Sequence, residues 1–446
     1  MKILNNLKNQ YFIDTYSLLL YLIVSFSFPK TDVLSIILIL LITLVQILRI
    51  VYNKVSIKVV SNTYFFLLVF SLPFYRSVHT LILVLNIIFN LWFFFKERPR
   101  LNLKDYKTEA YILILFTIIL INSIIHKPFL KDIDTYLYIL FYPFLFILLR
   151  LNSINNIVQR AVKTYITSVL LLSVYLFSIN LFNNKLSLTT NTFFSESTEM
   201  IHVYFGMYLG LALTFLIILF VKNENYLNRK LDILVFLFFF LLLINIGART
   251  ALFSVFIIIA TVIFLMVNAN IFVKITISAL TILILMVVGY KTIPRVKDDL
   301  ISMQNMYSSI ETDNKEDLVN NSWSNMYKRY LVLDYSIKEI KNHFVFGIGL
   351  GNVTHKISDQ ILKDGYKYFQ PMNTHNQYLH YLLGLGIFAF LYFIFILFRF
   401  KVYNPEWGYF LLFFMLVMLT ESILVRVKGI SLFFMFYLVF SSHKNH

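Results

Sequence analysis

The sequence predicts an all-α polytopic membrane protein with about twelve to fourteen transmembrane helices and one long, partly helical extracytoplasmic loop. Hydrophobic residues make up 59% of the 446 residues and charged residues only 14%, whereas soluble domains carry about 25% charged residues. A soluble chain of this composition could not cover its surface with polar atoms. The apolar residues fall into separate runs, and one long polar segment interrupts them.

Each apolar run is bounded by charged residues or proline and is a candidate for one membrane crossing, which takes about 20 residues in a helix. The runs cover residues 16–28, 33–48, 59–75, 79–95, 110–125, 136–149, 163–182, 202–221, 233–246, 251–267, 272–290, 377–398, 408–425 and 430–440. Three of these runs are short, which also fits re-entrant or tilted segments and lowers the count to about twelve.

The positions of lysine and arginine predict the orientation. With the N-terminus in the cytoplasm, 20 of the 39 basic residues lie in cytoplasmic loops and eight in short outer loops. The other eleven lie in the long polar segment, to which the positive-inside rule does not apply. Both termini are therefore expected in the cytoplasm and the long loop outside. The net charge of +16 is mostly a topology signal, and we expect no nucleic-acid partner.

The chain divides into an N-terminal bundle of transmembrane helices (residues 1–290), the extracytoplasmic loop (291–376) and C-terminal transmembrane helices (377–446). Acidic and basic residues nearly balance in the loop. Asn320, Asn321 and Ser322 supply helix N-cap chemistry, and the apolar residues after them recur at helical spacing, which predicts an amphipathic helix. Those residues are Trp323, Met326, Tyr327, Tyr330, Leu331, Ile337 and Ile340.

Half of the 12 glycines lie within about forty residues of one another, at Gly347, Gly349, Gly351, Gly365, Gly384 and Gly386. Glycine lets backbone N–H groups approach an anionic ligand closely. The same residues also suit a tight loop that returns the chain to the membrane. The spacing favours neither reading.

Arg249 lies in the very short outer connection between two apolar runs. An arginine at this position can extend to lipid headgroups. A cation on the outer side nevertheless opposes the positive-inside bias, and an ionisable residue at the membrane indicates function by default. Since its planar, permanently charged guanidinium suits phosphate, we expect Arg249 to bind an anion.

Arg329 and His375 are candidates that the residues alone support less strongly. Arg329 lies on the predicted amphipathic helix, and most arginines on such helices lie on the solvated face. His375 lies where the loop re-enters the membrane. An imidazole titrates near neutral pH and suits proton abstraction, although a single interfacial histidine is often merely polar. His380 is five residues away, a poor spacing for a metal, and no metal site is expected.

Glu421 and Arg426 lie at the outer end of a late helix, where they suggest an internal ion pair that fixes the helix end. Both remain possible site residues, as does Arg76 in an earlier outer loop. The chain has no cysteine, which excludes disulfides, thiolate metal sites and cysteine nucleophiles.

At these residues the sequence resembles the O-antigen ligase and O-antigen polymerase superfamily of membrane glycosyltransferases. The matching segments are Gly247-Ala248-Arg249-Thr250-Ala251-Leu252, then Arg329 upstream of Asn342-His343-Phe344-Val345-Phe346-Gly347-Ile348-Gly349-Leu350-Gly351-Asn352, and His375-Asn376-Gln377-Tyr378-Leu379 leading into Leu383-Gly384-Leu385-Gly386-Ile387. Their order, and the long loop between the second and third, make the combination fairly specific over residues 200–400.

The resemblance implies a glycosyltransferase C-type fold in the bacterial inner membrane, with a periplasmic loop and no cofactor or metal. The donor would be a glycan on undecaprenyl pyrophosphate and the acceptor a hydroxyl of lipid A–core or a similar lipid or glycan. By the same resemblance, Arg249 and Arg329 would bind the pyrophosphate and His375 would act as the catalytic base near the acceptor. A further arginine described for ligases would be Arg426 or Arg76.

Two alternatives accompany this expectation. A polymerase of the same superfamily differs from a ligase only in its acceptor. A polysaccharide flippase has a similar number of helices, but transporters often carry inverted repeats and helices broken near the midplane. The chain shows no internal repeat, and its ionisable groups concentrate at one face, so transfer ranks above transport.

Overall fold

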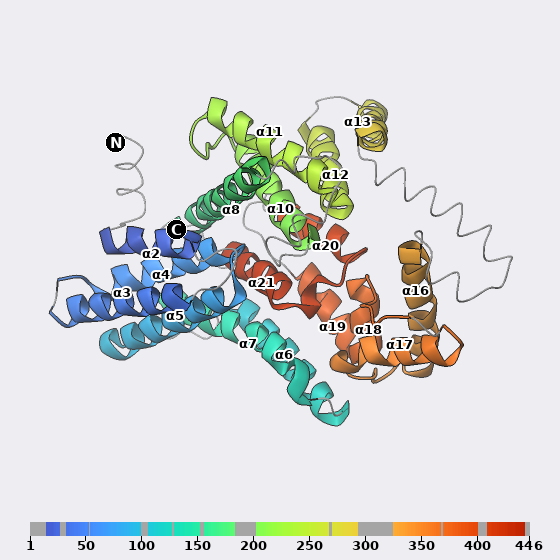
Figure 1. The fold of residues 1–446 in the computed structure, drawn as a ribbon, viewed down its shortest axis with the longest axis horizontal. Coiled ribbons are helices and arrows are strands. Elements are labelled where there is room, and N and C mark those ends of the chain that lie inside the picture. The colour runs from blue at the N-terminus through green and yellow to red at the C-terminus, as the bar shows by residue number, and fades with distance from the viewer. Residues whose placement is uncertain are drawn as a thin grey trace.

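The computed structural model describes residues 15–26, 33–52, 54–99, 106–126, 129–151, 156–182, 202–266, 270–292, 324–366, 369–399 and 408–441. Within these ranges it forms seventeen α-helices and no strand (Figure 1). Seven of the described helices are long and apolar enough to cross a membrane, and five more are apolar but shorter. The predicted class, an all-α polytopic membrane protein, is confirmed, whereas the number of crossings stays a prediction.

The first half of the chain forms one side of the bundle. Its helices are α2 (Thr15–Phe26), α3 (Val33–Val51), α4 (Ile57–Ser71), α5 (Arg76–Glu97), α6 (Lys107–His126), α7 (Phe129–Leu151) and α8 (Ile157–Phe182). The main pairs are α4 with α5 and α6 with α7, and α4 also packs against α8. The core between them is apolar and rich in aromatic side chains such as Tyr64, Phe65 and Phe146.

The central helix of the second half is α10 (His202–Val221), which is the most deeply buried of the seven candidate spans. It packs against α8, α11 (Arg229–Ile246), α12 (Arg249–Met266) and α20 (Gly408–Met418). The described part of this half also contains α13 (Ile271–Thr292) beside α12, and α21 (Val427–Ser441), which packs against α7. Among the helices that pack on α10, α11 and α12 flank the turn that carries Arg249.

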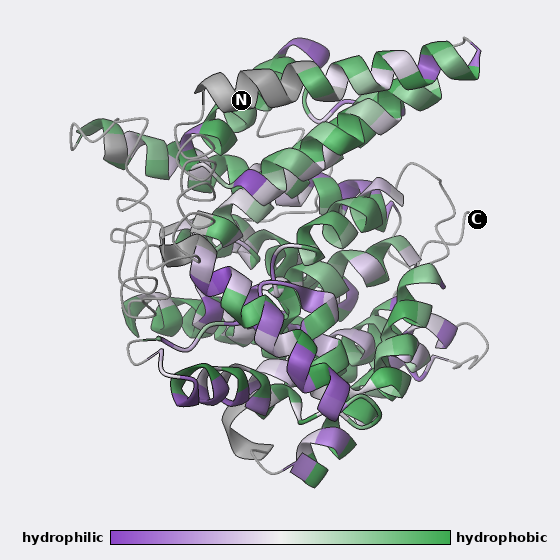
Figure 2. Cartoon of the chain, turned by 90° about the vertical axis from the view of Figure 1, so that its right-hand side faces the viewer, coloured by the Kyte–Doolittle hydropathy of each residue, from purple (hydrophilic) through white to green (hydrophobic). Residues whose placement is uncertain are grey.

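The described part of the polar segment 291–376 builds a second small core together with α18 (Gln377–Leu385). The predicted amphipathic helix is α16 (Ser324–Asn342), and α17 (Val353–Lys363) follows the short helix η2 (Leu350–Asn352). Tyr327 and Leu331 are buried as expected, but Tyr330 and Ile337 are exposed. The predicted cap residues 320–322 lie outside the described residues. In Figure 2 this side faces the viewer, and hydrophilic residues gather there against mostly hydrophobic helices.

Two of the predicted runs are broken. The run 377–398 forms α18 (Gln377–Leu385) and α19 (Ile387–Phe398), which are separated at Gly386. The run 408–425 ends early, with α20 closing at Met418 before the short helix η4 (Ile423–Val425). Hydropathy averaged over a run of about 20 residues does not reveal either break, because a single glycine at 386 and three polar residues at 420–422 are short interruptions in otherwise apolar runs. The second break puts residues 419–422 in an irregular connection, where they form contacts described below.

Candidate active site at the outer ends of the helices

Glu421 joins two of the predicted site residues. It lies in the connection after α20, and its Oε1 is 3.3 Å from an Nη2 of Arg329 on α16. Its Oε2 is 3.3 Å from Nδ1 of His375, which precedes α18. The Glu421 side chain is 14% exposed, and those of Arg329 and His375 are 40% and 21% exposed. Three segments far apart in the sequence therefore meet at one partly buried carboxylate.

The groups around Glu421 favour its ionised form. Burial opposes ionisation, but the hydrogen bond from His375 and the positive charge of Arg329 outweigh it and hold the pKa of Glu421 below its ordinary value. Since an ionised carboxylate only accepts hydrogen bonds, the proton in the contact with His375 lies on Nδ1. The Nε2 atom of His375 is then the nitrogen that can accept a proton.

The chain around His375 is fixed by a set of short-range polar contacts. His375 has a φ of 50°, in the left-handed region. On either side of it, the hydroxyl of Thr374 lies 2.9 Å from that of Ser422, and the side chain of Asn376 accepts from the N–H of Leu379, capping α18. These contacts compensate for the strained backbone. They also tie the start of α18 to the connection that carries Glu421.

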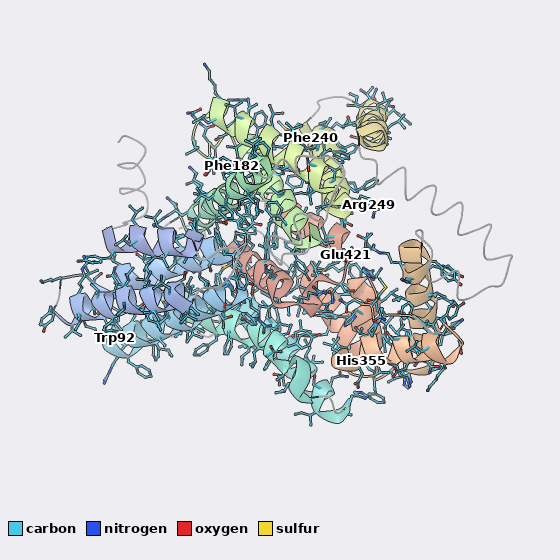
Figure 3. All side chains as sticks on the ribbon, viewed as in Figure 1. Trp92, Phe182, Phe240, Arg249, His355 and Glu421 are labelled. Atoms are coloured by element: carbon cyan, nitrogen blue, oxygen red, sulfur yellow. The ribbon has the colours of Figure 1, made fainter. Side chains whose placement is uncertain are left out.

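Arg249 begins α12, two residues after the left-handed Gly247 (φ 66°) that ends α11. The residue after Arg249, Thr250, lies with its hydroxyl 2.8 Å from the hydroxyl of Thr420, the residue before Glu421. Arg249 and Glu421 are therefore each one residue from a contacting pair. Figure 3 shows Arg249 at the end of α12 that faces this region, with its side chain exposed.

The contact between Thr250 and Thr420 can be tested directly because the chain has no cysteine. We expect Thr250→Cys with Thr420→Cys to form an intramolecular disulfide on mild oxidation, since the side-chain oxygens are 2.8 Å apart and disulfides join Cβ atoms about 3.5–4.5 Å apart. Thiol counting with a maleimide polymer would reveal it, with the two single-cysteine variants as controls. Two free thiols in the oxidised double variant would contradict this placement.

Among the described contacts, neither Arg426 nor Arg76 forms an ion pair with Glu421. The expected ion pair between Glu421 and Arg426 is wrong: the guanidinium of Arg426 lies 5.8 Å from the ring centre of Tyr204 on α10, whereas Glu421 contacts Arg329 and His375. Both side chains act electrostatically on Tyr204, but the polar contacts of Glu421 go to Arg329 and His375. Arg76 forms a 2.6 Å ion pair with Asp134 of α7.

The glycine-rich segment is a tight loop that docks on the break between α18 and α19. The N–H groups of Ile348 and Gly349 donate to the carbonyls of Leu383 and Gly384, at 3.0 and 2.9 Å. The N–H of Gly347 donates to His343. Since these N–H groups are already bonded, they are not available to an anion. The structure thus favours the second of the two readings of the glycines.

Gly386 is the position where this docking depends most on glycine. Its φ is 79°, and an added Cβ would lie 2.2 Å from the carbonyl oxygen of Val345. We expect Gly386→Ala to lower the free energy of unfolding by about 2 kcal/mol or more, from left-handed strain and overpacking. Gly408→Ala is the matched control, because nothing lies within 4 Å of its Cβ position. Thermal unfolding in detergent measures both, and equal midpoints would contradict the expectation.

Sequence reasoning missed three features of this region. It did not predict α17, although Val353, Ile357 and Ile361 recur at helical spacing and are all buried. It did not place Glu421 against His375 or join Thr250 to Thr420, since both contacts link distant segments. In the described part of the chain, no three histidine or acidic side chains cluster as metal ligands would.

Residues 234–394 match the family model described as O-antigen ligase. The matched segment extends from α11 into α19 and contains Arg249, Arg329 and His375, while Glu421 lies beyond it. The searches of curated proteins and of solved structures each returned no match. The family match agrees with the motifs in the sequence and with the membrane helices. The match over residues 234–394, a little more than a third of the chain, supports the O-antigen ligase and O-antigen polymerase superfamily of glycosyltransferase-like membrane proteins.

Proposed function

We propose that the protein transfers a glycan from undecaprenyl pyrophosphate to an acceptor hydroxyl, in the manner of an O-antigen ligase, at the outer face of the bacterial inner membrane. The main observation behind this proposal is that two predicted site residues contact the same carboxylate, that of Glu421. Arg329 and His375 contact Glu421, and Arg249 is one residue from the contact beside it. A site that must hold a diphosphate and deprotonate a hydroxyl needs these groups together.

Arg249 and Arg329 would stabilise the leaving group. As the bond between the sugar C1 and the diphosphate oxygen breaks, the electron pair stays on the undecaprenyl diphosphate and its negative charge grows. Fixed guanidinium groups stabilise that charge most in the transition state. Glu421 would hold Arg329 in place before the donor arrives, at 3.3 Å. Outside the cytoplasm no nucleotide sugar is supplied, so the activation must come with the lipid-linked donor.

His375 would act as the general base. Its Nε2 takes the proton of the acceptor hydroxyl as that oxygen attacks C1, while Nδ1–H remains bonded to Glu421. The carboxylate fixes the tautomer and stabilises the imidazolium that forms, as in other base–carboxylate pairs. One direct displacement inverts the configuration at C1, and no metal takes part in this scheme.

The topology forms part of the proposal. With both termini cytoplasmic, residues 1–290 and 377–446 supply the membrane helices, and the segment 291–376 lies in the periplasm with the site. The tight turn at Gly247 and the connection that holds Glu421 meet through Thr250 and Thr420. This contact supports their placement on one face. An impermeant maleimide should label the single variant Thr420→Cys from the periplasm.

Glu421→Gln tests the positioning role of the carboxylate. We expect the transfer rate to fall by roughly 10²-fold or more, because an amide can donate to Nδ1 and favour the wrong tautomer of His375. The matched control is Glu339→Gln on α16, which removes another glutamate–histidine contact, to His343 at 3.5 Å. Single-turnover transfer measures both, and an unchanged rate in Glu421→Gln would remove the proposed role.

The function itself is tested by reconstitution. The purified chain in detergent, supplied with a defined undecaprenyl-pyrophosphate glycan and lipid A–core, should form a glycosidic bond with release of the lipid diphosphate. A flippase would form no such bond. Transfer only to a second lipid-linked glycan would identify a polymerase. In cells, loss of a ligase leaves unattached lipid-linked polymer, whereas loss of a polymerase leaves single repeats on the lipopolysaccharide.

A further inference from the structure

A second site lies at the opposite end of α11 and α12 from Arg249. A cavity of about 570 Å³ opens between α10, α11 and α12, a volume typical of ligand sites, which range from about 300 to 1,000 Å³. Its walls are mostly apolar, and the five polar or charged lining residues all lie between 223 and 232. They include Leu216 and Phe220 of α10, Phe236 and Leu237 of α11, and Val262 and Ile263 of α12.

The cavity exists because α11 and α12 diverge. Both pack closely against α10, but they contact each other little after the turn that joins them. Along α11 the lining extends from Arg229 to Leu237, a rise of about 12 Å at 1.5 Å per residue. One half of a bilayer's hydrocarbon core is about 15 Å thick. The cavity therefore spans most of the thickness of one leaflet and lies at the end of α11 and α12 away from the Arg249 turn.

The rim of the cavity has one cation without a counter-charge. The guanidinium of Arg229 is exposed and lies 4.9 Å from the ring centre of Phe220. The two acidic residues on the rim are engaged elsewhere. Asp232 accepts the N–H groups of Tyr226 and Leu227, both at 2.9 Å.

The second acidic residue, Glu224, contacts Lys222 at 3.1 Å and the side-chain amide of Gln159 at 3.1 Å. Among the described residues no carboxylate forms an ion pair with Arg229. An apolar cavity with a cation on its rim is complementary to an amphipathic anion, whose apolar part would fill the cavity and whose charge would contact the cation.

We propose that this cavity binds a phospholipid, with one acyl chain between α11 and α12 and the lipid phosphate on Arg229. A glycan would leave its hydroxyl groups unpaired against these apolar walls. A neutral part of a polyprenyl tail would make no use of Arg229. The bound chain would fill the gap between the two helices whose turn carries Arg249. The site is separate from the glycan-transfer region and does not depend on the proposed function.

Native mass spectrometry of the full-length protein, delipidated in detergent and titrated with phosphatidylglycerol, tests this proposal. We expect one tightly bound lipid per wild-type chain. Arg229→Gln should weaken its binding at least tenfold, and Ile263→Trp should abolish it by filling the cavity. The matched controls are Lys230→Gln, a neighbouring exposed cation outside the lining, and Leu265→Trp, an exposed position on α12 outside the lining.

Unchanged lipid binding in both Arg229→Gln and Ile263→Trp would overturn the proposal. So would equal losses in the two control variants, because binding would then be non-specific. Organic extraction of the purified protein provides a second readout. A phospholipid retained by the wild type and lost from Ile263→Trp is the expected result, and a retained polyprenyl lipid in its place would contradict it. Each variant is compared with the wild type only if it elutes as a single folded species in size-exclusion chromatography.

Discussion

His375→Ala is expected to lower the rate of glycan transfer by about 10²- to 10⁴-fold while the amount of folded protein in the membrane stays normal. The magnitude is that of a lost general base, and the imidazole has no second hydrogen-bond partner beyond Glu421 in the described residues. Product formation from a defined lipid-linked donor is the measurement, with immunoblotting of membranes for protein level.

His343→Ala is the matched control for this substitution. His343 is a partly exposed histidine on the same polar segment, residues 291–376, and also contacts a glutamate, Glu339. It lies at the end of α16, away from the contacts of Glu421, and its loss should leave transfer within about twofold of the wild type. Full activity of His375→Ala would remove the proposed base, and equal losses in the two variants would point to a structural effect on the loop.

Arg249→Ala is expected to lower transfer by about 10²- to 10³-fold, the loss typical of removing one group that stabilises developing negative charge. Arg249→Lys should also be impaired, because an ammonium is a point charge without the planar fork of the guanidinium. The control is Arg399→Ala, an exposed arginine that follows α19. Wild-type rates in Arg249→Lys would argue against two-point recognition of phosphate.

Much of the fold follows from the sequence because the physics of a membrane helix is local. Long apolar runs between charges predict helices that cross the bilayer, and α5, α10 and α12 lie where such runs predict them. The amphipathic helix α16 follows in the same way from its periodic apolar residues. The breaks at Gly386 and after Met418 do not follow, because they depend on a distant loop that docks there and on contacts such as Thr374 with Ser422.

The sequence suggests the members of the proposed site, but it does not suggest their arrangement. Arg249, Arg329 and His375 stand out as ionisable groups at the membrane and as parts of motifs. From the sequence, Glu421 is predicted to form a local ion pair with Arg426, since residues close in sequence are the default partners. Tertiary packing brings it instead to α16 and to the start of α18. No periodicity in a single sequence encodes that choice.

A double-mutant cycle between Arg249→Lys and Arg329→Lys, measured as single-turnover transfer by the purified protein, asks whether both guanidinium groups hold the same departing diphosphate. Groups that share one partner are coupled, typically by about 0.5–3 kcal/mol, whereas distant sites add within about 0.5 kcal/mol. We predict that the double variant is slowed by clearly less than the product of the two single effects. Effects that simply multiply would show two separate sites and contradict the shared role proposed for the two arginines.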